Sequence, residues 1–152
     1  MIQRIQTVYL ALALLLMGFL GWLPLGEIAA GIQVYTFNIK GVFAEGANSA
    51  MISGWPLMLL LSIIEVLQIV VIFSFKKRVR QMRISTFVIL LMIGFFGVSW
   101  YFVHASLKTI GEGAYVFQMA MAFPLVAAIL NYLAIRAIGK DEALVRSIDR
   151  IR

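Results

Sequence analysis

The segment WPLMLLLSIIEVLQIVVIFSF, residues 55–75, determines the fold class that we expect for this chain. It is apolar almost throughout. Its length matches the roughly 20 residues that a helix needs to cross a hydrocarbon layer about 30 Å thick. Glu65 is its one ionisable side chain. The segment therefore predicts a membrane-spanning helix and raises the question of what retains a carboxyl group inside it.

Three further apolar blocks flank this segment, at about residues 5–23, 84–104 and 115–138. A buried core helix of a soluble protein would explain one such block, but not four of them in 152 residues. Hydrophobic residues make up 62% of the chain and charged residues only 13%, whereas a soluble domain has about 25% charged residues. We therefore predict an all-α membrane protein, a single domain over residues 1–152 with four transmembrane helices in a bundle.

The positively charged MIQR that precedes the first block, together with that block, also suits a secretory signal peptide. Its apolar core is long for that role, and the following GWLPLGEIAAG offers a poor small-residue cleavage site. We expect an uncleaved anchor. The chain contains no cysteine, so disulfides are excluded and thiols give no information on the compartment.

The net charge of +6 is distributed unevenly along the chain. Eleven of the 13 basic residues precede the first block, fill the short connection between the second and third, or close the chain, and two, Lys40 and Lys108, lie on the other side. Because basic residues favour the cytoplasmic side of a membrane, this distribution predicts a multi-pass protein with both termini cytoplasmic.

The basic clusters would also attract the anionic headgroups of membrane lipids. Binding to RNA, ribosomes or another acidic partner is the alternative, but topology explains the placement, and we expect no nucleic-acid partner. The candidate contacts to headgroups or a partner are Lys76, Lys77, Arg78, Arg80, Arg83, Arg146 and Arg150.

Two segments outside the blocks have patterns of their own. In the extracytoplasmic loop, residues 24–54, GIQVYTFNIKGVF is rich in β-branched and aromatic residues between glycines, which predicts a short β-like segment or hairpin. In the cytoplasmic tail, residues 139–152, Leu144, Ile148 and Ile151 share one stripe of an amphipathic helix that follows Gly139. Within the fourth block, Pro124 predicts a bend.

Glu65, Gln68 and Asn131 form the candidate intramembrane polar site. A charged residue near the bilayer centre costs about 2.5 to 3.5 kcal/mol, so a protonated Glu65 with a hydrogen-bonded partner is expected. Counting along the helices places Gly94 at the height of Glu65 and Tyr9 at the height of Asn131. Glu65 is either a structural hydrogen-bonding group, a proton or cation carrier, or a contact to another subunit.

Other chemistry has little support. One histidine and no cysteine leave no ordinary zinc site, and His104 lacks the partners of a catalytic triad. No phosphate-binding glycine loop is present. We therefore expect no enzyme, no metal and no cofactor.

The two ends of the chain, MIQRIQTVYLALA and KDEALVRSIDRIR, resemble a bacterial family of small four-helix inner-membrane proteins that is catalogued only as a domain of unknown function. The resemblance covers essentially the whole chain. It implies four spans in a bacterial cytoplasmic membrane and transfers no catalytic residues. In outline the chain also resembles claudin-like proteins, but it lacks their outer-loop cysteine pair.

The function expected from these observations is that of a non-enzymatic accessory or scaffold subunit of a membrane complex, with a protein partner or a second copy. The alternative is a small transporter or proton- or ion-coupled carrier centred on Glu65, with Gln68 and Asn131 lining an aqueous cavity. A third option is a lipid-binding or lipid-modifying protein with a lateral groove near Tyr35, Phe37 or His104.

Overall fold

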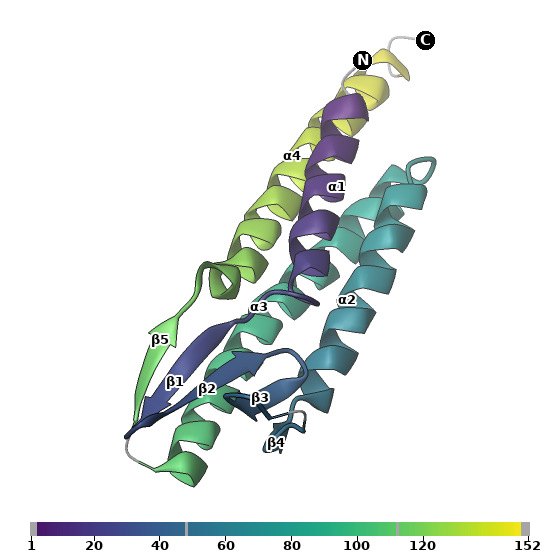
Figure 1. Ribbon diagram of the computed structural model, residues 1–152. Coiled ribbons are helices and arrows are strands. Elements are labelled where there is room, and N and C mark those ends of the chain that lie inside the picture. The colour runs from purple at the N-terminus through teal and green to yellow at the C-terminus, as the bar shows by residue number, and fades with distance from the viewer. Residues whose placement is uncertain (1–2, 48, 112, 150–152) are drawn as a thin grey trace.

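The computed structural model describes residues 3–47, 49–111 and 113–149, and this part of the chain forms four α-helices and one five-stranded sheet (Figure 1). The helices are α1 (Gln3–Phe19), α2 (Trp55–Phe73), α3 (Arg78–Ile110) and α4 (Phe123–Asp149). The strands are β1 (Gly26–Ala30), β2 (Gln33–Asn38), β3 (Gly41–Ala44), β4 (Ile52–Ser53) and β5 (Ala114–Phe117). A short 3₁₀ helix, η1 (Met119–Ala122), leads from β5 into α4.

The helices pack in the cyclic order α1, α4, α3, α2, with the most extensive contacts between α1 and α4 and between α3 and α4. Each helix buries a narrow stripe, such as Leu10, Ala13 and Met17 on α1. The opposite faces expose large apolar side chains, including Leu12 and Leu15. A helix that is apolar all round is typical of a buried or membrane-spanning segment.

Length and composition distinguish α1 from the other helices. Among the described residues, three helical segments are long and apolar enough to cross a membrane, namely Trp55–Phe73, Arg78–Ile110 and Met119–Leu144. The apolar part of α1, Ile5–Phe19, is shorter. The expected apolar helices are therefore present, three of them at spanning length.

The two ends of the helix bundle differ in structure. At one end, called the inner end here, α1 begins, α4 ends and residues 74–77 connect α2 to α3 (Figure 1). At the opposite, outer end lies the sheet. The 33 residues of α3 span about 50 Å at 1.5 Å per residue, well beyond a hydrocarbon thickness of about 30 Å. The outer part of α3 supports the sheet, because Phe102 stacks on the fully buried Phe37 of β2 with ring centroids 6.4 Å apart.

The sheet is antiparallel throughout, in the order β4-β3-β2-β1-β5. Ala30 pairs with Gln33, so β1 and β2 are joined by a two-residue turn that starts at Gly31 with φ +62°. Glycine suits that turn because it adopts positive φ without strain. Gly41 has φ +137°, and a Cβ there would lie 2.1 Å from the carbonyl oxygen of Ile52, so β3 and β4 approach closely only because this residue lacks a side chain.

Strand β5 brings the second outer connection into the same sheet. It pairs with β1, with Gly26 opposite Phe117 and Ile28 opposite Tyr115. The Tyr115 hydroxyl donates to the carbonyl oxygen of Leu25 at 3.0 Å. Just beyond β5, Gln118 Nε2 donates to Glu27 Oε1 at 2.9 Å. Both outer connections are thus fixed to each other.

The predicted all-α bundle with a short β-like segment is therefore wrong, because the fold is mixed, with four helices and a five-stranded antiparallel sheet. The GIQVYTFNIKGVF segment does contain β2 and most of β3. The expectation missed β1, β4 and β5, which are short and gain their hydrogen bonds from neighbours distant in sequence. Residues near Tyr115, expected to open the fourth span, form β5 instead.

The fourth helix corrects two further expectations. Pro124 lies at the second position of α4, where proline is tolerated, and does not bend the helix from within. The tail is not a separate amphipathic helix, because α4 continues through Gly139 to Asp149. Gly139 faces α3, where an added Cβ would lie 3.9 Å from Met82 Sδ. The expected stripe ends at Ile151, and Arg150 also lies outside the described residues, as does the side chain of Arg146.

Candidate functional site

The predicted polar residues Glu65 and Gln68 lie one turn apart on α2 and face α1. Gln68 is fully buried, and its Nε2 donates to the carbonyl oxygen of Leu10 on α1 at 3.0 Å. Glu65 is half-buried beside Gly18, where an added Cβ would lie 3.8 Å from Glu65 Oε1. The structure therefore brings both residues to the α1–α2 contact, called the polar seam here.

Asn131, the third predicted residue, lies elsewhere. Its Nδ2 donates to the carbonyl oxygen of Ala127 at 3.1 Å and contacts Met92 Sδ on α3 at 3.6 Å. The side-chain amide of Asn131 thus contacts α3 and α4 and is not part of the polar seam. The expected partner was Tyr9 on α1. Glu65 likewise has Gly18 as its glycine neighbour, whereas an added Cβ at Gly94 would meet no atom within 4 Å.

Counting residues along α1 would have identified Gly18. It lies 15 residues from the start of α1, about 22 Å, and Glu65 lies about 16 Å from Lys76. The two heights agree within about one helical turn. The predicted neighbour, Gly94 of the third block, was therefore wrong, and Gly18 is the glycine that adjoins the acid.

Several buried oxygens accept no hydrogen bond from the described residues. On the polar seam these are Glu65 Oε1 and Gln68 Oε1, and in the rest of the bundle Ser85 Oγ, Ser99 Oγ and Asn131 Oδ1. Buried polar groups are normally hydrogen-bonded. The polar seam is chemically distinct from the rest of the bundle interior, because two unpartnered oxygens lie one turn apart there. These oxygens can bind a proton or accept a hydrogen bond.

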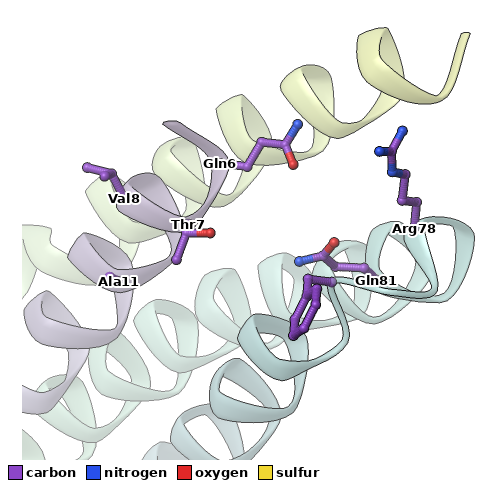
Figure 2. Close-up of a pocket in the computed structure, with 7 residues that line it drawn as sticks. Gln6, Thr7, Val8, Ala11, Arg78 and Gln81 are labelled. Carbon is purple, nitrogen blue, oxygen red and sulfur yellow. The ribbon is translucent and has the colours of Figure 1, made fainter. Parts of the chain in front are cut away.

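Three clefts lie at the inner end of the part of the chain that the structure describes. The first, of about 410 Å³, is called the inner cleft here and lies between α1 and the start of α3 (Figure 2). Its polar lining is Gln6, Thr7, Arg78 and Gln81, and its apolar lining is Val8, Ala11 and Phe75. Figure 2 shows Gln6 and Thr7 on α1, across the cleft from Arg78 and Gln81 on α3.

Hydrogen bonds fix the two amides of the inner cleft. Gln6 Nε2 donates to Asp141 Oδ2 of α4 at 3.0 Å. Gln81 is buried, and its Nε2 donates to the carbonyl oxygen of Val71 at 3.0 Å. By contrast, Arg78 Nη1 is buried without a hydrogen-bond acceptor among the described residues. Arg78, the one charged residue of the lining, therefore has an N–H donor available for a bound group.

The second cleft gathers most of the predicted headgroup contacts, and the third contains none of them. The second, of about 630 Å³, is lined by Val79 and Glu142 and by the basic residues Lys76, Lys77, Arg78, Arg80 and Arg83. The third, of about 390 Å³, has Arg136 and Lys140 beside apolar residues of α1 and α4. Glu65, Gln68 and Asn131 line none of these clefts.

At the outer end, the expected lipid groove near Tyr35, Phe37 and His104 is not formed by Phe37, which is buried in the core. His104 packs edge-on against Trp100, with ring centroids 5.0 Å apart. Burial raises the pKa of Tyr115 to about 12. Within the described residues, no three His, Cys, Asp or Glu side chains are grouped so as to hold a metal ion.

A family model described as a domain of unknown function (DUF4293) matches residues 2–151. No curated protein and no solved structure matches the chain. The match confirms the resemblance to a family without assigned function that the two ends of the chain had suggested.

Proposed function

The chain belongs to the DUF4293 family, whose function is unknown, and from that premise we propose that it is a multi-pass protein of the bacterial cytoplasmic membrane that serves as a non-enzymatic accessory or scaffold subunit. Its partner would be another membrane protein or a second copy of the chain. The proposed orientation puts both termini and the inner end in the cytoplasm, and the sheet outside.

The surface of the helices supports the membrane location. Large apolar side chains are exposed along all four helices, for example Leu15, Val66, Leu90 and Ile129. In water such a surface would promote aggregation, whereas in a bilayer it faces lipid. Trp22, Trp55 and Trp100 lie toward the outer ends of their segments, as interfacial tryptophans do. The basic residues of the α2–α3 connection lie at the opposite end, which fits the proposed orientation.

The observation that most favours a scaffold is the five-stranded sheet, which offers a folded surface beyond the helices. Apolar side chains are exposed on it, with Val116 and Phe117 on the edge strand β5 and Ile32 at the β1–β2 turn. An exposed edge strand can pair with a strand of another chain. A partner strand at β5 would form hydrogen bonds with the backbone N–H and C=O groups along that edge and would cover Val116.

Site-specific crosslinking in native membranes tests this proposal. A photoreactive residue at Val116 should yield a discrete crosslinked product, either a dimer of the chain or a complex with one other protein. The matched control is Ile129, which is similarly exposed but lies on α4, and it should crosslink mainly to lipid. A strict monomer after mild detergent extraction, with no product from Val116, would contradict the scaffold proposal.

A second candidate function is a small proton- or ion-coupled carrier centred on Glu65. It is favoured by the unpartnered oxygens of Glu65 and Gln68 on one seam. Proton flux into vesicles that contain the purified chain should then depend on the acid and be lost in Glu65→Gln. Ser62→Ala, which changes an exposed hydroxyl one turn away, should leave the flux unchanged. Equal flux with Glu65→Gln would reject the carrier.

A further inference from the structure

The geometry of the inner cleft points to a binding site for one anionic glycerophospholipid, with its phosphate at Arg78 and an acyl chain along Val8 and Ala11. This inference rests on the proposed membrane location, but it concerns a single site that neither the family nor the scaffold proposal assigns. A cleft of about 410 Å³ lies within the range of small-molecule sites, about 300–1,000 Å³.

The charge of the lining selects an anion. Arg78 is the one charged residue among the seven that line the cleft, and its buried Nη1 has no acceptor in the described residues. A buried guanidinium donor is costly to leave unpaired. A phosphate diester supplies acceptor oxygens in a geometry that a planar guanidinium matches well.

The two amides make the site specific rather than merely basic. Gln6 and Gln81 line the same cleft as Arg78. Each has its Nε2 hydrogen-bonded to another acceptor, Asp141 Oδ2 and the Val71 carbonyl oxygen respectively. These bonds hold the amide groups in place, so that each presents its oxygen as an acceptor. A glycerol-type headgroup, which has hydroxyl donors beyond its phosphate, matches acceptors placed beside a cation.

The apolar lining favours a lipid over a soluble phosphate. Val8 on α1 and Phe75 in the α2–α3 connection are both exposed, so that the cleft opens sideways from the bundle. Ala11 lies eight residues from the start of α1, about 12 Å along the helix axis. That depth extends from the headgroup level into the region of the first acyl carbons, where a free phosphate has nothing to contact.

The full chain in a neutral detergent tests the site. Native mass spectrometry would measure retention of added phosphatidylglycerol and, separately, of zwitterionic phosphatidylethanolamine. We expect preferential retention of phosphatidylglycerol, and a loss of roughly tenfold in its affinity in Arg78→Gln, as for a charge-assisted hydrogen bond. Inorganic phosphate and glycerol phosphate, assayed by the shift in Tm, should have little effect at equal concentration.

Two comparisons make the result decisive. Arg83→Gln removes a charge from the second cleft but not from the inner cleft and should retain the lipid. Ala11→Phe fills the inner cleft and should displace the lipid without a change of charge, whereas Leu15→Phe, on the exposed face of α1, should not. The Ala11 pair remains informative if Arg78→Gln fails to fold.

Three results would overturn the inference: equal losses in Arg78→Gln and Arg83→Gln, equal retention of the two lipids, or binding of glycerol phosphate as strong as that of the lipid. Recovery of the folded chain without detergent would instead contradict the proposed membrane location. A chain that needs detergent but shows no lipid preference would leave that location intact and reject this site alone.

Discussion

The two ends of the helix bundle differ in how firmly their chain segments are held to one another. The outer end is closed, because the five strands, the Phe37–Phe102 stack and the Tyr115 and Gln118 hydrogen bonds tie every outer connection to another. The inner end has fewer such ties and holds three clefts with a cluster of cations, while a further cleft lies beside His104 and Lys108 at the outer end. The difference indicates that substitutions at the outer end should affect mainly stability, while those at the inner end should affect mainly binding.

The largest expected effect is that of Gly41→Ala at the outer end. Alanine would have to adopt the positive φ of Gly41, and its Cβ would lie 2.1 Å from the Ile52 carbonyl oxygen. Backbone strain and overpacking should together lower the free energy of unfolding by about 3 kcal/mol, measured as a fall in Tm in detergent.

Gly46→Ala is the matched control for this change, because Gly46 also has positive φ, +77°, but an added Cβ meets no atom within 4 Å. In Gly46→Ala the free energy of unfolding should fall only by the cost of the backbone strain, about 1 kcal/mol. If the two variants are equally stable, the close approach of β3 and β4 does not contribute to the closed outer end.

Tyr115→Phe should have an intermediate effect at the same end. It removes the hydrogen bond to Leu25 and should reduce stability by about 1 kcal/mol. The pKa of Tyr115 is raised from 10.0 to about 12, so its contribution is complete below pH 10 and is lost as the pH rises toward 12.

Ultraviolet titration of the folded proteins would detect the raised pKa of Tyr115. Wild type should have one tyrosine that ionises at higher pH than the others, and Tyr115→Phe should lack it. Wild type should also lose more stability than the variant between pH 10 and pH 12. A parallel pH dependence in the two proteins would show that Tyr115 is not buried by the β1–β5 pairing.

The smallest expected effect is at the inner end. Asp141→Ala removes the acceptor of Gln6 Nε2 and should lower stability by about 1 kcal/mol or less, because the pair is only partly buried. Asp141→Asn retains an acceptor oxygen and should behave as wild type. Thermal unfolding in one detergent compares all three. A loss as large as that of Gly41→Ala would mean that the inner end is not the loosely held one.

The sequence predicted the helices better than their partners. Hydropathy identified α2 and most of α3 because it reports the solvent that a segment prefers, and the basic run between them marked their connection. The same measure misplaced the start of α4, since AYVFQMAMA reads as apolar helix although its first four residues form β5. Strand β5 is stabilised by β1, and no local pattern indicates that pairing.

The candidate site shows the same limit. Glu65 and Gln68 stand out as polar residues in an apolar block, and their i, i+3 spacing places them on one helix face. Which helix they face depends on the packing order, which a single sequence does not specify. For the same reason Gln6 and Asp141, which are 135 positions apart, gave no signal of their contact, and the inner cleft was not predicted.

The β1–β5 pairing also has a consequence for biogenesis. Tyr115 and the carbonyl group that it contacts are 90 positions apart, and α2 and α3 lie between them. During synthesis the edge of β1 that pairs with β5 therefore has no partner strand until α2, α3 and residues 114–117 have been made. In the proposed membrane orientation, the nascent hairpins would be exposed in that interval to chaperones and proteases outside the cytoplasm, until pairing with β5 covers the edge of β1.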